Sequence, residues 1–252
     1  MKNIHKKINF NFGERIAKRI ASSGVCSRRE AEKLIIEGKV KLNDKIVFQC
    51  NLNVSKNDLI LVDGKSIPKK EPIRLWLFYK EKGFLVTNND PQGRPTIFEK
   101  INSKVNIRMI AIGRLDLNSE GLLLLTNNGE LARKLELPKN GFIRKYKVRV
   151  FGQIDEKKLK ILKKGIEIDG FKYKSILAKL QKQQKSNAWI SMAFKEGKNR
   201  EIRKIMSHFG YPVNKLIRIS YGPFSLNSLK PGDLIEIEEK KINEILKSSF
   251  SK

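Results

Sequence analysis

A polar loop that leads directly into an apolar run, within residues 113–129, constrains the fold of this chain most strongly. The loop places the carboxylate of Asp116 between two glycines and two residues after Arg114. Four leucines, residues 122–125, come next, and an Asn-Asn-Gly turn ends the run. The length of the run and the turn residues around it predict a buried strand. A loop anchored on such a strand can hold an active-site acid, whereas in an isolated Arg-x-Asp the acid more often caps a turn and the arginine screens it.

The whole chain carries a large excess of positive charge. It has 53 Lys and Arg residues against 26 Asp and Glu, a formal net charge of +27. Such a charge destabilises a compact chain through self-repulsion, and its usual explanation is a polyanionic partner. Residues 1–66 hold 14 basic and 7 acidic side chains and residues 67–252 hold 39 and 19, so both parts are expected to meet that partner. The alternative is compositional drift, because Lys, Asn and Ile are plentiful throughout.

The cysteine and histidine content argues against a metal site. The cysteines are Cys26 and Cys50 and the histidines are His5 and His208, without metal-ligand spacing. We therefore expect two reduced structural thiols in a cytoplasmic protein and no bound metal. No apolar run approaches the length of a membrane span, about 18 residues. The first residues lack the apolar core of a signal peptide, so residues 1–13 are expected to form a basic arm.

Residues 14–64 predict a small module of two helices and a hairpin. Apolar spacing indicates a first helix over residues 14–21. A Ser-Arg-Arg-Glu capping box at residues 27–30 opens a second helix, which a glycine ends. Residues 40–47 then indicate a hairpin with an Asn-Asp turn.

Two arginines, Arg28 and Arg29, lie in the first turn of the second helix, where cations oppose the helix dipole. This placement makes more sense if phosphate groups approach that turn. The pattern of residues 15–43 resembles an RNA-binding domain of the ribosomal-protein-S4 type. The resemblance implies an RNA-binding face formed by the helices and the hairpin. The residues expected on it are Arg15, Lys18, Arg19, Arg28, Arg29, Lys39 and Lys41.

The charged segment 65–73, with two prolines and no periodicity, is expected to link this module to a larger domain over residues 74–252. In an alternating strand of that domain Tyr146 lies in line with two valines, and by itself it is most simply a core residue. Arg94 lies in a polar loop, where an RNA contact and a solvated arginine are about equally consistent with the sequence. Arg203 lies beside the apolar stripe of a helix, where it can pair with a carboxylate inside a pocket, although a surface ion pair is the ordinary case.

Periodicity and turn residues predict the other elements of the larger domain. A helix that follows a glycine-containing loop is expected to end at Gly210, and residues 181–187 are expected to form a hairpin loop. The expected strands cover residues 75–79, 122–125, 142–151, 171–180, 189–194, 216–223 and 234–237, and further helices cover residues 130–135, 155–164 and 241–247.

Three separated stretches, residues 113–129, 145–146 and 196–203, resemble the signature of pseudouridine synthases. Their order behind an RNA-binding module resembles the RsuA/RluB branch of that family, which modifies ribosomal RNA. The resemblance extends over residues 15–237. It implies an α+β fold, in which the small two-helix-plus-hairpin domain precedes a catalytic domain with a long, mostly antiparallel mixed sheet flanked by helices. The active cleft is then expected across the middle of that sheet.

The same resemblance assigns roles to individual residues. Asp116 matches the aspartate that attacks the target nucleotide, and Tyr146 matches the tyrosine that stacks on the base. Arg203 matches the basic residue that ion-pairs with the aspartate, and Arg114 is expected to help hold the flipped nucleotide. The isomerisation involves no redox change, so no cofactor is expected. Further contacts with RNA are expected from Arg94, Lys198 and Arg200.

The sequence departs from the family in three places near these motifs. Residues 79–83 read Tyr-Lys-Glu-Lys-Gly where relatives usually have Asn-Lys-Pro-x-Gly. Ala111 replaces a common proline and Asn128 a common aspartate. These changes affect the local loop geometry more than they affect Asp116, Tyr146 and Arg203.

The expected function is the isomerisation of a uridine in ribosomal RNA to pseudouridine. The Asn-Arg-Glu-Ile-Arg form of the third motif resembles members that act on large-subunit (23S) rather than small-subunit (16S) RNA. We expect a cytoplasmic monomer that meets its RNA in an assembling subunit. A competing hypothesis is a non-catalytic RNA-binding or ribosome-assembly factor, although such a factor has no need of the intact catalytic residues. A general basic nucleic-acid binder is a weaker alternative, which competition by duplex DNA tests.

Overall fold

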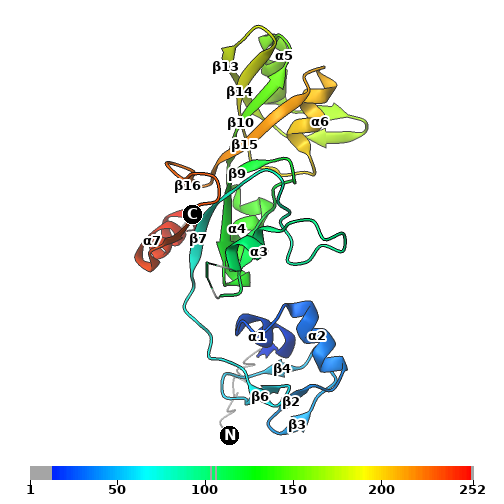
Figure 1. Ribbon diagram of the computed structural model, residues 1–252, viewed down its shortest axis with the longest axis vertical. Coiled ribbons are helices and arrows are strands. Elements are labelled where there is room, and N and C mark those ends of the chain that lie inside the picture. The colour runs from blue at the N-terminus through cyan, green and yellow to red at the C-terminus, as the bar shows by residue number, and fades with distance from the viewer. Residues whose placement is uncertain (1–12, 103, 106, 251–252) are drawn as a thin grey trace, which may run out of the picture. The chain divides into compact units, whose positions relative to one another are not determined.

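The structure is a computed structural model that describes residues 13–102, 104–105 and 107–250 (Figure 1). The expected basic arm, apart from Gly13, and His5 lie outside the described residues. The chain divides into two compact units, residues 1–72 and 73–252. No helix that the structure describes is both long and apolar enough to span a lipid bilayer.

Unit 1 packs two helices on short strands, as the sequence predicts. Ser27 caps the second helix by accepting a hydrogen bond from the backbone N–H of Glu30, so the predicted helix start at Ser27 is confirmed. The core of unit 1 contains Ile16, Ile20 and Ile35, all fully buried. The elements are β1 (Glu14–Arg15), α1 (Ile16–Ser22), α2 (Arg28–Ile36), β2 (Val40–Leu42), β3 (Lys45–Ile46), β4 (Asn53–Val54), β5 (Ile60–Val62) and β6 (Lys65–Ser66).

Two boundaries of unit 1 differ from the expectation. The first helix begins at Ile16, because Glu14 and Arg15 pair with β4 instead of joining it. The expected linker starts with structure, because β6 pairs with β5 across a turn in which Asp63 and Gly64 both have positive φ. Side-chain periodicity cannot indicate a strand of two residues, so this hairpin was missed.

Unit 2 is built on a nine-stranded mixed sheet of order β13-β14-β10-β15-β9-β7-β17, with β8 and β16 attached beside that path. The pair β15–β9 is parallel and the other pairs are antiparallel, which confirms the expected α+β class with a mostly antiparallel sheet. The elements around the middle of the sheet are β7 (Leu75–Lys80), α3 (Ile97–Asn102), β8 (Ile110–Ile112), β9 (Glu120–Thr126), α4 (Gly129–Glu136) and β15 (Val213–Tyr221). The others are β10 (Arg144–Phe151), α5 (Glu156–Ile161), β11 (Ile166–Ile168), β12 (Phe171–Tyr173), β13 (Leu177–Gln183), β14 (Asn187–Phe194), α6 (Glu201–His208), β16 (Phe224–Ser225), β17 (Leu234–Ile237) and α7 (Glu239–Phe250).

Strand β9 is buried on both faces, which explains its unbroken run of leucines. Leu123 and Leu125 belong to a core that includes residues of α3, α5 and α6. Leu122 and Leu124 belong to a second core that includes residues of α4 and α7. Because successive side chains of a strand point to opposite faces, the two sets of helices cover opposite faces of the sheet here. This central strand gives the preceding loop a rigid base.

Several elements of unit 2 were predicted incorrectly or missed. The single strand expected over residues 171–180 is two strands, of which β12 pairs with β11 and β13 joins the large sheet. The expected hairpin loop shrinks to residues 184–186, because the polar end of β13 continues as an exposed strand at the sheet edge. The short elements α3 and β8 carried too few residues for a periodic signal.

Asn128, which stands where relatives often have an aspartate, caps helix α4. Its side-chain oxygen accepts from the backbone N–H groups of Glu130 at 3.0 Å and Leu131 at 2.9 Å. An amide oxygen satisfies these helix-end donors as a carboxylate does. The substitution therefore keeps the local geometry.

Candidate active site

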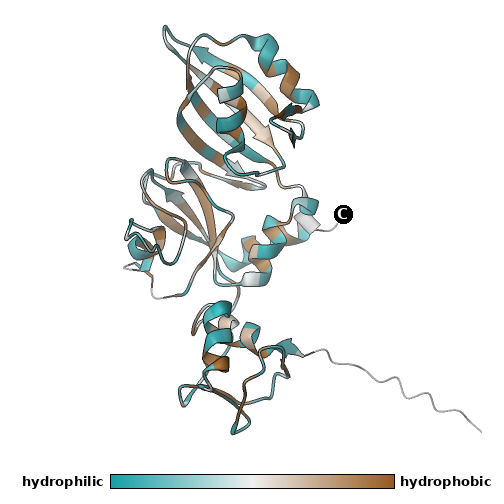
Figure 2. Ribbon diagram, turned by 90° about the vertical axis from the view of Figure 1, so that its right-hand side faces the viewer, coloured by the Kyte–Doolittle hydropathy of each residue, from teal (hydrophilic) through white to brown (hydrophobic). Residues whose placement is uncertain are grey.

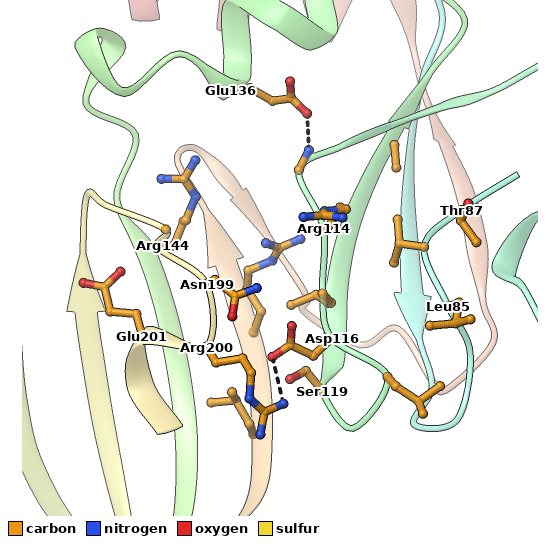
Figure 3. Close-up of a pocket in the computed structure, with 18 of the residues that line it drawn as sticks. Leu85, Thr87, Arg114, Asp116, Ser119, Glu136, Arg144, Asn199, Arg200 and Glu201 are labelled. Atoms are coloured by element: carbon orange, nitrogen blue, oxygen red, sulfur yellow. Dashed lines mark hydrogen bonds and ion pairs between the residues drawn. The ribbon is translucent and has the colours of Figure 1, made fainter. Parts of the chain in front are cut away.

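A cleft of about 1130 Å³ opens where the middle strands of the sheet meet the loop before β9 and the start of α6. Asp116 and Arg114 enter it from the loop, and Tyr146 from β10. Arg200 approaches from the start of α6, and Figure 3 shows it facing Asp116. The structure thus brings the three sequence-separated motifs to one cleft.

The backbone of the loop that carries Asp116 is held at several points. The N–H of Gly113 donates to a carboxylate oxygen of Glu136 at 2.6 Å. Within the loop the N–H of Ser119 donates to the carbonyl oxygen of Asp116 at 2.9 Å. The N–H of Gly83 donates to the carbonyl oxygen of Leu117 at 2.8 Å. These bonds fix the path of the chain on both sides of the carboxylate.

Lys80 is a buried support of this loop that sequence reasoning missed. Its side chain is fully buried, and Nζ donates to the carbonyl oxygens of Glu81 at 3.0 Å, Asp116 at 3.1 Å and Ser119 at 2.9 Å. Burial lowers the pKa of Lys80 to about 8, against a smaller opposing effect of Asp116. The available signal was a lysine that ends an apolar strand, within the segment that departs from the family pattern.

The basic residue that ion-pairs with Asp116 is Arg200, whereas Arg203 was expected. Nη1 of Arg200 lies 3.9 Å from Oδ2 of Asp116. Arg203 instead donates to the carbonyl oxygens of Asn118 at 2.7 Å and Val213 at 3.0 Å. The reason lies in the helix start: α6 begins at Glu201, so Arg200 lies outside the helix with φ of 50° and reaches the cleft. Burial lowers the pKa of Arg203, and the neighbouring Arg200 adds to this effect.

Tyr146 is both a core residue, as the strand alternation predicts, and a residue of the cleft, as the family resemblance implies. It is 8% exposed and belongs to the core, yet it also lines the cleft. Its ring stacks on that of Phe194, with 5.3 Å between centroids and 9° between planes. The two rings come from paired strands, and both reach the cleft. They provide an aromatic wall near Asp116.

A second group of side chains fixes the loop before α6. Arg144 donates from Nη1 to the carbonyl oxygens of Lys195 at 2.7 Å and Glu196 at 3.2 Å. The carboxylate of Glu201 is buried, and one of its oxygens accepts from the N–H of Lys198 at 2.9 Å. Burial raises the pKa of Glu201. Neither residue was predicted to serve the site, because an arginine at a strand start and a glutamate at a helix start are common surface residues.

The remaining predicted residues have separate places. Arg94 lines the cleft and pairs with Asp90 at 2.8 Å; its hydrogen bonds lower the pKa of Asp90 to about 2. Lys198 also lines the cleft, with Nζ 3.6 Å from Glu196. In unit 1, ion pairs join Lys18 to Glu14, Arg28 to Glu32 and Lys39 to Glu37, while Arg15, Arg29 and Lys41 are exposed and Arg19 is partly buried. Among the residues that the structure describes, no cluster of His, Cys, Asp and Glu could hold a metal ion.

Comparisons with known proteins agree with these features. A family model described as RNA pseudouridylate synthase matches residues 74–208, and a model of the S4 domain matches residues 14–60. An uncharacterized RNA pseudouridine synthase of Rickettsia felis is 50% identical over 227 residues, which cover 90% of this chain and 98% of the relative. The ribosomal large subunit pseudouridine synthase B of Yersinia pestis is 37% identical over 237 residues, covering 92% of this chain and 74% of the relative.

A solved structure has the same overall fold. The crystal structure of a pseudouridylate synthase matches this chain with a TM-score of 0.64 at 25% sequence identity, covering 92% of this chain and 99% of the other. The fold match extends over nearly the whole chain, as the sequence matches do. The chain therefore belongs to the RNA pseudouridylate synthase family, as an isomerase with an amino-terminal S4 domain.

Proposed function

We propose that this synthase isomerises one uridine of large-subunit (23S) ribosomal RNA to pseudouridine, with Asp116 as its catalytic residue. The observation that carries the proposal is that Asp116 and Tyr146 line one cleft together with Arg114 and Arg200. The choice of the large subunit is supported by relatives named ribosomal large subunit pseudouridine synthase B, from Yersinia pestis and Pasteurella multocida. The third motif, Asn-Arg-Glu-Ile-Arg, is consistent with this choice.

The reaction breaks the bond between the ribose C1′ and N1 of uracil and forms a bond between the same C1′ and C5. The uridine first leaves its stack, at a cost of roughly a few kcal/mol, which pocket contacts offset. Asp116 then acts on the flipped nucleotide as nucleophile or base, and the glycosidic bond breaks. The detached uracil turns, C5 bonds to C1′, and C5 loses its hydrogen as a proton while N1 gains one. Atoms and electrons balance without a redox cofactor.

The surrounding residues have complementary roles in this proposal. Arg200, at 3.9 Å, places a cation beside the Asp116 carboxylate. Arg203 positions the loop through Asn118. The aromatic wall of Tyr146 and Phe194 supports the uracil ring while it turns. Arg114, exposed at the cleft, holds a phosphate of the flipped nucleotide.

Unit 1 supplies RNA affinity in this proposal, through the basic residues of its helices and hairpin. Phosphate contacts of this kind position an RNA without reading its sequence. We further propose that the protein acts as a cytoplasmic monomer on RNA in an assembling subunit. The alternative of a non-catalytic assembly factor is disfavoured by the supports around Asp116, because a binding module gains nothing from fixing one carboxylate at several points.

The test is tritium release from ribosomal RNA labelled at C5 of uracil. The C5 hydrogen is lost when the ring reattaches through C5, so the wild type is expected to release tritium. Asp116→Asn is expected to release none while its RNA affinity stays within a few-fold. Asp169→Asn is the matched control, since Asp169 is an exposed turn residue with φ of 51°, which Asn also adopts. A wild type that binds RNA tightly without release favours the assembly factor, and an active Asp116→Asn variant removes Asp116 from its role.

A further inference from the structure

The outer four strands of the large sheet have a strongly basic composition. Strands β13, β14, β10 and β15 together hold eight Lys and Arg residues and no Asp or Glu. Two of the eight, Arg144 and Arg218, serve the middle of the sheet: Arg144 holds the loop before α6, and Nε of Arg218 donates to the carbonyl oxygen of Leu122 at 2.7 Å. The other six are Lys145, Lys147, Arg149, Lys179, Lys182 and Lys215.

These six residues lie on one face of the sheet. On β10 they alternate with Tyr146, Val148 and Val150, which point into the core beneath α5 and α6. Because alternate residues of a strand point to opposite faces, the six cations lie on the face opposite to that core. Figure 2 shows the alternation of hydrophilic and hydrophobic residues along these strands. We call this surface, formed by the six cations and Trp189, the basic face.

Trp189 lies at the centre of the basic face. In the strand register it is opposite Arg149 on one neighbouring strand and Lys182 on the other. Nζ of Lys147 lies 4.7 Å from the centre of its ring. Cations interleaved with an exposed or half-exposed aromatic ring are the combination that binds single-stranded nucleic acid, because the cations meet phosphates and the ring stacks on a base.

Among the described residues, five of the six cations of the basic face lack an acidic partner. Within the described part of the chain, Lys145, Lys179 and Lys182 make no ion pair; Lys215 pairs with Glu120 at 3.4 Å. Arg149 and Lys215 are directly opposite in the register, an arrangement that destabilises a sheet by like-charge repulsion. At the sheet edge, Lys145 and Lys179 join Lys160 and Lys163 around a hollow of about 400 Å³. A polyanion relieves this repulsion.

We propose that the basic face binds a single-stranded segment of the substrate RNA that flanks the target uridine, with its phosphates on the lysines and a base stacked on Trp189. The proposal rests on the proposed function only in taking RNA as the substrate. The basic face is on the side of the sheet opposite to Tyr146, so the segment bound there is separate from the nucleotide in the cleft. It adds affinity and anchors the RNA on both sides of the sheet.

The first test removes three charges from the basic face of the full-length protein. We expect Lys147→Gln, Lys179→Gln and Lys182→Gln together to weaken binding of a long ribosomal RNA fragment by about tenfold or more and to flatten the salt dependence of the dissociation constant, since each phosphate contact contributes to that slope. The matched control replaces three exposed lysines near and within α7, Lys230, Lys240 and Lys241, by Gln. Equal losses in the two triple variants, or no loss in the first, would overturn the proposal. Thermal melting of both variants checks that each is folded.

The second test uses the tryptophans as reporters. The chain has two, and Trp76 is 2% exposed in the core, so quenching by RNA is expected to come from Trp189. RNA is expected to quench the fluorescence of the wild type and to leave that of Trp189→Phe nearly unchanged. Quenching that persists in Trp189→Phe contradicts the proposal, and so does the absence of quenching in the wild type. The absence of quenching is the result expected if the partner of the basic face is an acidic protein instead of RNA. Tritium release separates the two proposals. If the wild type is inactive but RNA still quenches Trp189, only the proposed reaction is contradicted. If the wild type is active but RNA does not quench Trp189, only the proposal for the basic face is contradicted.

Discussion

Arg203 donates a hydrogen bond from Nη2 to the backbone carbonyl oxygen of Asn118, two residues after Asp116, at 2.7 Å. Its Nη1 donates to the carbonyl oxygen of Val213 on β15 at 3.0 Å. One guanidinium thus joins helix α6, strand β15 and the loop of the carboxylate. Arg200 supplies the ion pair with Asp116, from a side chain that is 50% exposed. One arginine therefore holds the loop of Asp116, and another places a cation beside its carboxylate.

This division predicts different kinetics for the two arginine variants. Arg203→Ala leaves the Asn118 carbonyl without its donor and frees the loop, and a misplacement of about 1 Å costs about 100-fold in rate. We therefore expect kcat of Arg203→Ala to fall about 100-fold with little change in KM. Arg200→Gln removes an exposed ion pair, worth about 1 kcal/mol or less, so kcat is expected to fall less than tenfold. Single-turnover tritium release measures both, and a larger rate loss in Arg200→Gln contradicts the division.

Tyr146 is expected to act through its ring. Tyr146→Phe keeps the stack on Phe194 and the wall of the cleft, so RNA affinity is expected to stay within a few-fold. Tyr146→Leu loses the aromatic face, and base–aromatic stacking is worth about 1–3 kcal/mol. Filter binding of RNA to the two variants tests this expectation, with urea unfolding to separate loss of stability from loss of contact. Equal affinity of Tyr146→Leu and wild type would show that no base stacks on this residue.

The sequence predicted those parts of the site that have a local signature. The polar loop with Asp116 and the four leucines after it indicated a carboxylate in a loop anchored on a buried strand, and β9 confirms the strand. Alternation placed Tyr146 in the core, and only the family resemblance placed it at the active site, because periodicity reports burial and not what a buried ring faces. The structure shows that one position satisfies both.

The parts that were missed depend on where elements begin and end. Whether Arg200 or Arg203 meets Asp116 is decided by the start of α6 at Glu201, and sequence patterns locate helix ends poorly. The burial of Lys80 depends on three carbonyl groups, two of which belong to a loop more than 30 residues later in the chain. No local pattern carries that information. Long-range polar contacts of this kind become visible only in the folded chain.

Gly121 is expected to tolerate no side chain. Its φ is 102°, and an added Cβ would lie 2.3 Å from the backbone oxygen of Arg218 on the paired strand β15. Gly121→Ala therefore combines backbone strain with a clash that no side-chain rotation relieves, and we expect it to lower the free energy of unfolding by about 3 kcal/mol. Gly93→Ala is the matched control, because Gly93 also has positive φ but open space around it, and its cost is expected to be about 1 kcal/mol. Urea unfolding measures both, and equal costs would rule out the clash.

Lys80 is expected to give activity and stability opposite responses to alkaline pH. Its pKa is about 8 in the folded protein, against about 10.4 in an unfolded chain. Between these values the folded state has lost a proton that the unfolded state keeps, so the contribution of Lys80 to the free energy of unfolding rises with pH, by up to about 3 kcal/mol. The neutral amine, however, has two hydrogens for three carbonyl oxygens, so the loop of Asp116 loosens and activity falls above about pH 8.

The stability part of this prediction is read from the difference between wild type and Lys80→Met. That difference in the free energy of unfolding is expected to be flat below about pH 8 and to rise in favour of the wild type from there to about pH 10.4. The activity part is read from the alkaline limb of tritium release, which Lys80→Arg is expected to move to higher pH because an arginine keeps its charge. A flat stability difference across the whole range would mean that the folded and unfolded states hold this proton equally, and the same alkaline limb in Lys80→Arg would assign the loss of activity to another group.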